Sequence, residues 1–411
     1  MKKQLQISIA VILFLILGTA VAILYARGYR FGVDTGGKPQ LSKTGILNAQ
    51  STPNGSQVWI NDHLTTATNN SVSLTPGQYK ISIGKDGYHG WSKNVMIEKE
   101  VVTNTDAALW PAAPTLQSLS TFGIQNPIMD PSGTKLVFTI ANQTAKKNGV
   151  YVLDMTSRSF PVLIGQSTST QVASDTVDNF SKAKLSWSPD GEELIASVSS
   201  TLNIGPAYYL LRANTLNETP QDITATLQTA LDTWETQRTT KEQARLATLR
   251  LKARQLIRNS MDIIAWSPDE TKILYQAKKT GDLPVIITPR RIGNNLLYER
   301  RDLKKGDVYV YNIPEDLNTR IFETDKVYCN IQLESCTNHA LSWFPDNHHL
   351  VFVNNKKISI VEEDGSNMTT IYAGPFEDHY VFPWPDGSRL VILTNLGNTS
   401  IPPTLYSISL K

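Results

Sequence analysis

The residues of this 411-residue chain that could do chemistry are basic, and they gather in two segments. Between residues 238 and 258, seven arginines and lysines stand against one acidic residue, Glu242. Between residues 290 and 305, six more stand against Glu299 and Asp302. Because guanidinium and ammonium groups attract phosphates and carboxylates, the two segments predict a surface for an anionic surface polymer, lipid head groups or a protein partner. The candidate binding residues are Arg245, Arg250, Lys252, Arg254, Arg258, Arg290, Arg291, Arg300 and Arg301.

The first basic segment lies in a predicted helical insertion, residues 225–260. Its apolar residues recur at helical spacing, and Thr239 with Glu242 could open the basic arm as a capping box. These apolar residues are Leu227, Leu231 and Trp234 on a first arm, then Leu246, Leu249, Ala253, Leu256 and Ile257. In the alternative, the two arms form a hairpin that folds back on the rest of the chain and leaves the basic residues as a solvated face.

No motif of a known catalytic site is present in the sequence. A nucleophile elbow, a glycine-rich phosphate loop, a zinc-binding HExxH and a CxxC pair are all missing. His348 and His349 directly follow a Pro-Asp-Asn turn, so we expect exposed hairpin residues rather than metal ligands. Residues 362–367 lack the alternating ligands and the distant glutamate of a calcium loop. We therefore expect no enzymatic activity, no metal and no cofactor.

The two cysteines, Cys329 and Cys336, lie seven positions apart in a polar stretch. In an oxidising compartment they could close a small loop through a disulfide bond. On the chain-entropy model such a bond stabilises the fold by about 2 to 3 kcal/mol. The alternative is two unrelated thiols.

The N-terminus predicts a membrane anchor. After a cytoplasmic tail, residues 1–6, the run ISIAVILFLILGTAVAILYA (residues 7–26) carries no charge and no proline. A helix of this length crosses a hydrocarbon core of roughly 30 Å. Ala20-Val21-Ala22 has the pattern of a signal-peptidase site, but the apolar run continues past it, which favours an uncleaved anchor over a signal peptide. We expect a single-pass protein of the cell membrane with the bulk of the chain extracytoplasmic, since signal anchors begin with a short charged tail.

Composition favours an all-β protein. Hydrophobic residues make up 40% and charged residues 18% of the chain, as in ordinary folded proteins. Threonine, which favours strands, and serine, asparagine and glycine, which favour turns, are plentiful. The net charge of +2 is too small for a chain that binds nucleic acid in bulk, so we expect no nucleic-acid partner.

After a linker, residues 27–44, short strands alternate with turn residues over residues 45–110. The sequence motifs of this segment are Ser51-Thr52-Pro53-Asn54-Gly55, Val58-Trp59-Ile60-Asn61, Leu74-Thr75-Pro76-Gly77-Gln78-Tyr79 and Lys85-Asp86-Gly87-Tyr88. It resembles the PEGA domain, a compact β-sandwich of cell-envelope proteins, although Asn61-Asp62-His63 stands where the family turns on a glycine. The resemblance implies a spacer or binding module near the membrane, without catalysis.

A short phrase recurs five times in the remainder of the chain, residues 111–411. The copies are IMDPSGTKLVF (128–138), SWSPDGEELIA (186–196), AWSPDETKILY (265–275), SWFPDNHHLVF (342–352) and PWPDGSRLVIL (383–393). Each places an apolar residue, usually tryptophan, before a Pro-Asp or Pro-Ser turn, and a strand follows at once. With two further strands per unit, the pattern predicts four-stranded blades around a common axis. The repeats resemble those of TolB-type β-propellers, and we expect five blades, with six as the alternative.

The ring is predicted to close when residues 114–119 pair with residues 405–410. Four insertions are predicted to emerge on the face opposite the Pro-Asp turns, as a binding surface on a rigid scaffold. They are residues 165–182, 224–260, 279–306 and 324–338.

The pattern as a whole predicts a membrane-anchored extracytoplasmic binding or scaffold protein. One alternative is a purely structural spacer that sets a distance from the membrane. Another is a propeller associated with a hydrolase of the prolyl oligopeptidase type. That enzyme needs a separate α/β-hydrolase domain, and no residues remain to build one.

Overall fold

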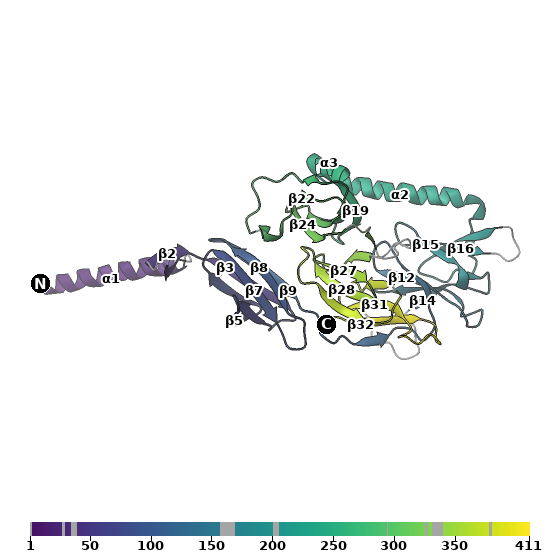
Figure 1. Cartoon of the computed structure of the whole chain (residues 1–411), viewed down its shortest axis with the longest axis horizontal. Helices are drawn as coiled ribbons and strands as arrows, with labels where there is room; N and C mark the ends of the chain where they lie inside the picture. The colour runs from purple at the N-terminus through teal and green to yellow at the C-terminus, as the bar shows by residue number, and fades with distance from the viewer. Residues whose placement is uncertain are drawn as a thin grey trace. The chain divides into compact units, whose positions relative to one another are not determined.

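The computed structural model of the chain describes residues 2–26, 29–33, 39–156, 169–199, 205–293, 295–324, 328–330, 340–377 and 380–411. The chain divides into two compact units (Figure 1). Unit 1 contains Met1–Trp110 and Pro289–Glu299, and unit 2 contains Pro111–Thr288 and Arg300–Lys411. The chain therefore passes between the units three times, after Trp110, after Thr288 and after Glu299.

The N-terminal helix α1 (Lys2–Ala26) is long and apolar enough to cross a membrane. Its side chains from Ile9 to Ala26 are exposed. The strands β1 (Tyr29–Val33) and β2 (Pro39–Lys43) follow as an antiparallel hairpin in which Tyr29 lies opposite Lys43. The hairpin thus returns the chain to the neighbourhood of Tyr29 before the next strand begins.

Unit 1 continues as a β-sandwich of two sheets, with strand orders β6-β3-β9 and β5-β4-β7-β8. The strands are β3 (Gly45–Thr52), β4 (Gln57–Ile60), β5 (His63–Ala67), β6 (Asn70–Leu74), β7 (Gly77–Gly84), β8 (Trp91–Ile97) and β9 (Val102–Ala108). Alternate residues point inward, so Leu47, Val58 and Ile81 are fully buried in one apolar core. At the β4–β5 turn, Asn61 and Asp62 adopt positive φ angles, which short polar side chains tolerate, and they can therefore stand in place of a glycine.

Unit 2 is built from five sheets of four antiparallel strands, which we number as blades 1 to 5. Blade 1 contains β11 (Gln125–Met129), β12 (Lys135–Ile140), β13 (Gly149–Asp154) and β14 (Ser169–Ser174). Blade 2 contains β15 (Lys184–Trp187), β16 (Glu193–Ser199), β17 (Pro206–Arg212) and β18 (Gln221–Asp222). Blade 3 contains β19 (Met261–Trp266), β20 (Lys272–Ala277), β23 (Val308–Asn312) and β24 (Leu317–Phe322).

Blade 4 contains β26 (Ala340–Trp343), β27 (His349–Asn354), β28 (Lys357–Glu362) and β29 (Thr369–Ala373), and β25 (Cys329–Asn330) is added in parallel to β26. Blade 5 contains β30 (Val381–Pro383), β31 (Arg389–Thr394), β32 (Thr404–Ser409) and β10 (Leu116–Ser118). The predicted closure is confirmed, because β10 pairs with β32 and so completes the last blade with a strand from the start of the unit.

The recurrent Pro-Asp turn joins the first strand of each blade to the second. In blades 2 to 5 the aspartate accepts a hydrogen bond from the backbone N–H two residues later, at 2.8 to 3.1 Å. These aspartates are Asp190, Asp269, Asp346 and Asp386. In blade 1 a serine follows the proline, and Asp130 accepts the equivalent bond from the N–H of Ser132 at 3.1 Å. The repeated phrase is therefore a turn signature, since the carboxylate satisfies a backbone donor that would otherwise lack a partner.

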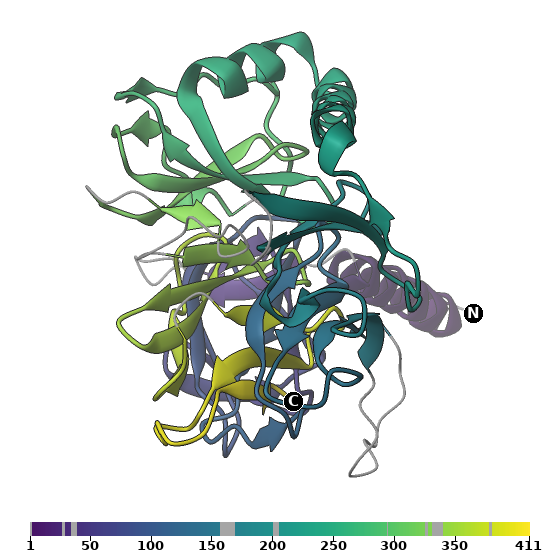
Figure 2. The same cartoon turned by 90° about the vertical axis from the view of Figure 1, so that its right-hand side faces the viewer.

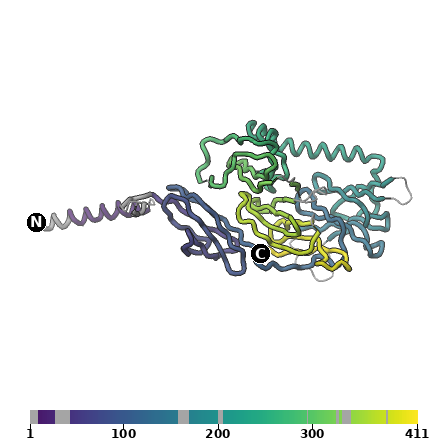
Figure 3. The backbone as a smooth tube through the Cα atoms, in the orientation of Figure 1, coloured from purple at the N-terminus to yellow at the C-terminus, as the bar shows by residue number. Residues whose placement is uncertain are grey.

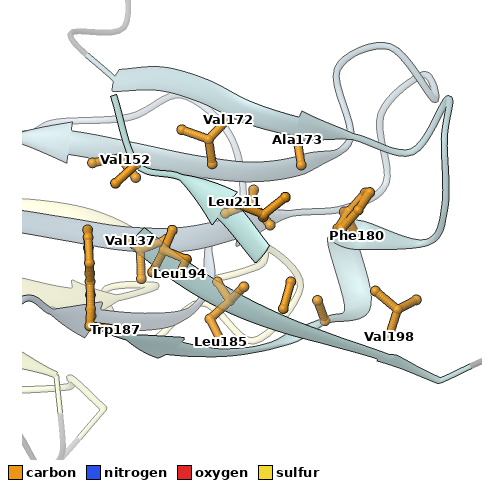
Figure 4. Close-up of a cluster of buried hydrophobic side chains, with 14 residues drawn as sticks. Val137, Val152, Val172, Ala173, Phe180, Leu185, Trp187, Leu194, Val198 and Leu211 are labelled. Carbon is orange, nitrogen blue, oxygen red and sulfur yellow. The ribbon is translucent and has the colours of Figure 1, made fainter. Parts of the chain in front are cut away.

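Blades 1 and 2, blades 3 and 4, and blades 5 and 1 pack face to face around a common axis (Figure 2). Trp187 of blade 2 donates its indole N–H to the carbonyl of Ile128 in blade 1 at 3.0 Å, and it belongs to the apolar cluster between these blades (Figure 4). Trp343 of blade 4 makes the same bond to Ala265 of blade 3 at 3.4 Å. The tryptophans of blades 2 and 4 thus lie between neighbouring sheets. A further cluster joins blade 5 to blade 1 through Phe138, Met155, Phe382 and Leu393.

Two helices lie between blades 2 and 3, α2 (Leu227–Ala247) and α3 (Leu251–Ser260), and Figure 3 follows the chain through them into β19. The face of blade 2 turned away from blade 1 packs on Trp234 of α2 through Ile195. The face of blade 3 turned away from blade 4 packs on Leu256 and Ile257 of α3 through Tyr275. The predicted capping box is wrong, because Thr239 and Glu242 lie inside a continuous helix that ends at Ala247.

The second insertion folds back along blade 3. Its strands β21 (Gly281–Asp282) and β22 (Asp302–Leu303) pair, and Leu283 and Leu303 are buried against Tyr309 and Tyr311 of the blade. Asp316, in the turn between β23 and β24, accepts hydrogen bonds from the backbone N–H groups of Ile286 and Ile287 at 2.6 and 2.9 Å. This turn lies on the same side of the blade as the Pro-Asp turn.

Candidate binding site at the mouth of the propeller

A cavity of about 450 Å³ opens on the side of the propeller that carries the Pro-Asp turns. The turns of blades 1, 3, 4 and 5 contribute Pro131, Pro268, Pro345 and Pro385 to its wall. Where the turn of blade 2 would complete the wall, Lys241 and Arg245 of α2 line it instead. The helical insertion therefore brings two cations to the mouth of the propeller.

Arg245 is held in place by three neighbours. Its Nη1 lies 3.1 Å from the carboxylate of Glu242, and its Nη2 lies 2.6 Å from that of Glu270. The guanidinium carbon lies 5.0 Å from the centre of the Trp266 ring, a distance at which a cation and an aromatic face attract. The hydrogen bond from Arg245 also lowers the pKa of Glu270 below its ordinary value. Trp266 thus stacks on α2, because the helix occupies the side on which the other blades meet a neighbour.

Two polar atoms in the wall of the cavity are buried and have no hydrogen-bond partner among the described residues, Nε of Arg245 and Oγ of Ser342. Ser342 is only 3% exposed. A buried hydroxyl or N–H without a partner costs roughly 1 to 3 kcal/mol, so a ligand that bonds to these atoms removes a penalty. Both atoms are donors, and the hydroxyl can also accept.

The remainder of the wall combines apolar surface with polar groups such as Ser132 and Ser267. Trp266, Trp343 and Met129 add aromatic and thioether surface to the ring of prolines. The charged groups at the site balance, since Lys241 and Arg245 face Glu242 and Glu270. A cavity that combines prolines and aromatic rings with a few convergent donors, and that has no net charge, suits an uncharged segment with carbonyl oxygens, such as an extended peptide.

The structure divides the predicted binding residues of the first insertion. Arg245 lines the cavity, whereas Arg250, Lys252, Arg254 and Arg258 lie on or beside α3. The side chains of these four form no ion pair with any described residue, and Arg254 is half-buried while the other three are exposed. At spacings of four residues, Arg250, Arg254 and Arg258 share one face of the helix. This basic face of α3 is a second candidate surface.

The predicted residues of the second insertion play different parts. Arg301 is 15% exposed and pairs with the buried carboxylate of Asp316 at 3.1 Å. Arg290 pairs with Glu299 at 2.7 Å. The backbone of Arg300 exchanges hydrogen bonds with Asn318. Only Arg291 and Arg300 have exposed side chains here, so Arg290 and Arg301 hold the insertion together.

Both basic insertions are predicted to emerge on the face opposite the Pro-Asp turns, but both extend to the face that carries these turns. Arg245 bonds to Glu270 in the Pro-Asp turn of blade 3. The second insertion folds back to Asp316, whose turn lies on that face too. A loop's point of departure does not fix where it ends, because both segments are long enough to run the height of a blade.

The structure bears on the predicted disulfide bond and on the predicted exposure of the two histidines. Cys329 is disulfide-bonded, and Cys336 lies outside the described residues. His348 is exposed as expected, but His349 is only 6% exposed and its Nδ1 lies 2.6 Å from Asp346. The residue is buried because it begins β27, whose sides both face neighbouring blades. Among the described residues no cluster of three metal-ligating side chains occurs.

Among the comparisons with known proteins, a family model matches the first unit. Residues 44–112 match the family model of the PEGA domain. A comparison with curated proteins found no match. Among solved structures, the chain is similar to a putative TolB from Agrobacterium tumefaciens, at 16% identity and a TM-score of 0.23, over 69% of this chain and 78% of that one.

Two further solved structures are similar. TolB from Acinetobacter baumannii matches at 13% identity and a TM-score of 0.19, over 81% of this chain and 60% of that one. The Cps50 (Swd1) β-propeller domain from Myceliophteria thermophila matches at 11% identity and a TM-score of 0.30, over 73% of this chain and 100% of that one. The propeller assignment itself rests on the strand order and on the packing of blade on blade. Residues 44–112 match the PEGA domain family and fold as a β-sandwich, and the described sheets of unit 2 form a five-bladed β-propeller.

Proposed function

We propose that this chain is a binding protein of the cell envelope, held to the membrane by α1 with its bulk extracytoplasmic, and that it has no catalytic activity. In this proposal the cavity at the mouth of the propeller holds an extended peptide segment of a protein partner. The observation that carries the proposal is the pair of buried donors without partners among the described residues, Ser342 Oγ and Arg245 Nε, in a cavity whose wall also carries prolines and tryptophans. Carbonyl oxygens of a peptide would satisfy both donors while its side chains contact the prolines and tryptophans.

The proposal is tested by photocrosslinking on intact cells that express the full chain. A photoreactive residue in place of the exposed Lys241, at the rim of the cavity, should capture a protein partner. The same residue in place of Gln228, near the other end of α2, should not, since thirteen helical residues place it roughly 20 Å away.

A second substitution separates binding from folding. Ser342→Ala removes a hydroxyl that bonds to no described residue, so the melting temperature should not fall. Capture of the partner by the photoreactive residue at position 241 should weaken by roughly two- to tenfold, which is the contribution of one hydrogen bond. Ser359→Ala, on the same blade, removes a bond to Thr370 and should lower the melting temperature without affecting capture. Capture that is equal from both α2 positions, or unchanged by Ser342→Ala, would contradict the proposal.

A second candidate function is the binding of an anionic surface polymer, and the unpaired cations of α3 favour it. Replacing Arg250, Arg254 and Arg258 together with glutamate reverses the charge of one helix face. The variant should no longer sediment with anionic wall material or anionic vesicles. High salt should likewise release the wild-type chain, because salt screens the attraction between the charges. Unchanged sedimentation would leave α3 as a solvated face, and the purely structural spacer would then be the better account of this region.

A further inference from the structure

Part of the propeller chain belongs to the PEGA unit. The tip of the second insertion, Pro289–Glu299, belongs to compact unit 1, although the rest of the insertion belongs to blade 3 of unit 2. It covers the free edge of β8, where the hydroxyl of Tyr298 accepts from the backbone N–H of Asn94 at 3.1 Å and Asn295 donates to the carbonyl of Asn94 at 2.9 Å.

Exposed apolar residues surround this tip at one end of the sandwich. Ile292 is 79% exposed, and the next residue, Gly293, lies against Val101 and the carbonyl of Val102. Val102 is 51% exposed and pairs in register with Ile46, which is 39% exposed. Three aliphatic side chains at the same end of the unit therefore face solvent, and Arg291 beside them is exposed and forms no ion pair with any described residue.

This end of the sandwich is the one at which the chain arrives from α1. Tyr29 is three residues past Ala26 and pairs with Lys43, and three more residues lead to Ile46. Extended residues span roughly 3.5 Å each and paired Cα atoms lie about 5 Å apart, so Ile46 lies within roughly 25 Å of the end of α1. The chain leaves the sandwich from the other end, because β3 and β9 run parallel from Ile46 and Val102 toward Thr52 and Ala108.

We infer that Ile46, Val102 and Ile292, with Arg291, form a contact with the lipid surface, so that the propeller supplies part of a second membrane attachment. The inference rests on the proposed anchoring by α1. Aliphatic side chains beside an unpaired cation suit the boundary between acyl chains and head groups. A protein partner is the alternative occupant of this end, but the short reach from α1 keeps the bilayer close to it and favours lipid.

The test uses the full chain in vesicles of mixed zwitterionic and anionic lipid. A cysteine in place of Ile292 carries an environment-sensitive fluorophore, attached without reductant so that the bonded Cys329 does not react. The emission should shift to the blue and be quenched by lipids that bear a spin label on the acyl chain. The matched control is Asp86→Cys, in the exposed turn between β7 and β8 at the opposite end of the sandwich, whose emission should resemble that in water.

The outcomes separate the inference from the proposal on which it rests. Flotation of the unlabelled wild-type chain with the vesicles reports its attachment to the membrane as a whole, and failure to float would overturn the proposed anchoring together with the lipid contact. If the chain floats but the fluorophore at position 292 shows no quenching by labelled lipid, the inference is wrong and the anchor stands. A blue shift without quenching would also overturn it, because it would indicate that protein covers this end.

Discussion

At the scale of single residues, Asp316 holds the second insertion to the propeller. Its fully buried carboxylate accepts from the N–H groups of Ile286 and Ile287 and from the hydroxyl of Tyr311, and it pairs with Arg301. Burial alone would raise the pKa of this carboxyl, but the hydrogen bonds outweigh burial and hold the pKa below its ordinary value. Asp316 thus holds Ile286, Ile287 and Arg301, which flank the tip of the second insertion, against the blade.

Asp316→Asn should lower the free energy of unfolding of the propeller by about 3 kcal/mol, because it leaves the half-buried Arg301 without its charge partner. Denaturation of the full chain in detergent measures this loss. The matched control is Asp302→Asn in the same insertion, an exposed position at which we expect a change within about 0.5 kcal/mol. Equal effects of the two substitutions would contradict the role assigned to Asp316.

The same carboxylate predicts a pH dependence. Its pKa is lower in the folded chain than in the unfolded chain, where an aspartate titrates near pH 4, about the ordinary value. The stabilisation is therefore fully present above that range and is lost as the pH falls through the folded-state pKa. The stability difference between wild type and Asp316→Asn should be constant at neutral pH and should shrink on acidification. A difference that is independent of pH down to pH 2, or about that value, would contradict this account.

At the scale of elements, α2 and α3 stand where two blades would otherwise meet directly. Trp234 is the one buried residue among those of α2, and Ala253, Leu256, Ile257 and Ser260 are buried in α3. The two helices therefore depend on tertiary contacts with blades 2 and 3 for most of their stability. Their position also decides the chemistry of the cavity, because it brings Lys241 and Arg245 to its wall.

Trp234→Ala should destabilise the chain by about 3 to 5 kcal/mol, the usual cost of truncating a large buried aromatic residue. It should also expose α2 to limited proteolysis before the sheets unfold. Leu231→Ala, one turn earlier and 39% exposed, should have a much smaller effect. Thermal melting and protease digestion of the two variants side by side provide the measurement, and identical digestion patterns would show that Trp234 does not dock the helix.

At the scale of the whole molecule, the propeller is closed by strands from its two ends. On either side of β10, the N–H of Leu119 donates to the carbonyl of Leu405, and the N–H of Ser409 donates to the carbonyl of Thr115. Ser407 lies between them and opposite Gln117, so its N–H points to the same side. Loss of this pairing would weaken the connection of the last blade to the first part of the unit. That connection would then depend on hydrogen bonds such as that from Ile124 to Pro403 and on the apolar cluster between blades 5 and 1.

Ser407→Pro should open the ring, because proline cannot donate to the ladder within a sheet. Hydrogen exchange measured by mass spectrometry should show lost protection in blade 5 and blade 1, while the core of the PEGA domain keeps its protection. Ser407→Ala retains the backbone N–H and should cost no more than about 1 kcal/mol for the lost side-chain bond to Gln117. Protection that survives in the proline variant would mean that the β10–β32 pairing does not close the ring.

The sequence alone predicted what depends on local patterns. The alternation in residues 45–110 and the five Pro-turn phrases fixed the sandwich and the blades, because turn chemistry and strand periodicity act over a few residues. Even the closing strand was visible, since the last repeat lacked a fourth strand. The candidate site was only partly visible. Arg245 stood out as one of many basic residues, whereas Ser342 carried no signal, because Ser186 precedes the tryptophan of blade 2 in the same way.

Tertiary structure decided where the long segments end. Nothing in the spacing of residues 225–260 shows that the helices lie between two blades or that Arg245 faces the Pro-Asp turns, because helix placement follows from packing against distant strands. The transfer of Pro289–Glu299 to the PEGA unit is likewise a matter of contacts about two hundred residues away in the chain, such as that of Asn94 with Tyr298. The sequence determined the repeating elements and the apolar helix, and only the fold decided which side chains meet at the cavity and at the end of the sandwich.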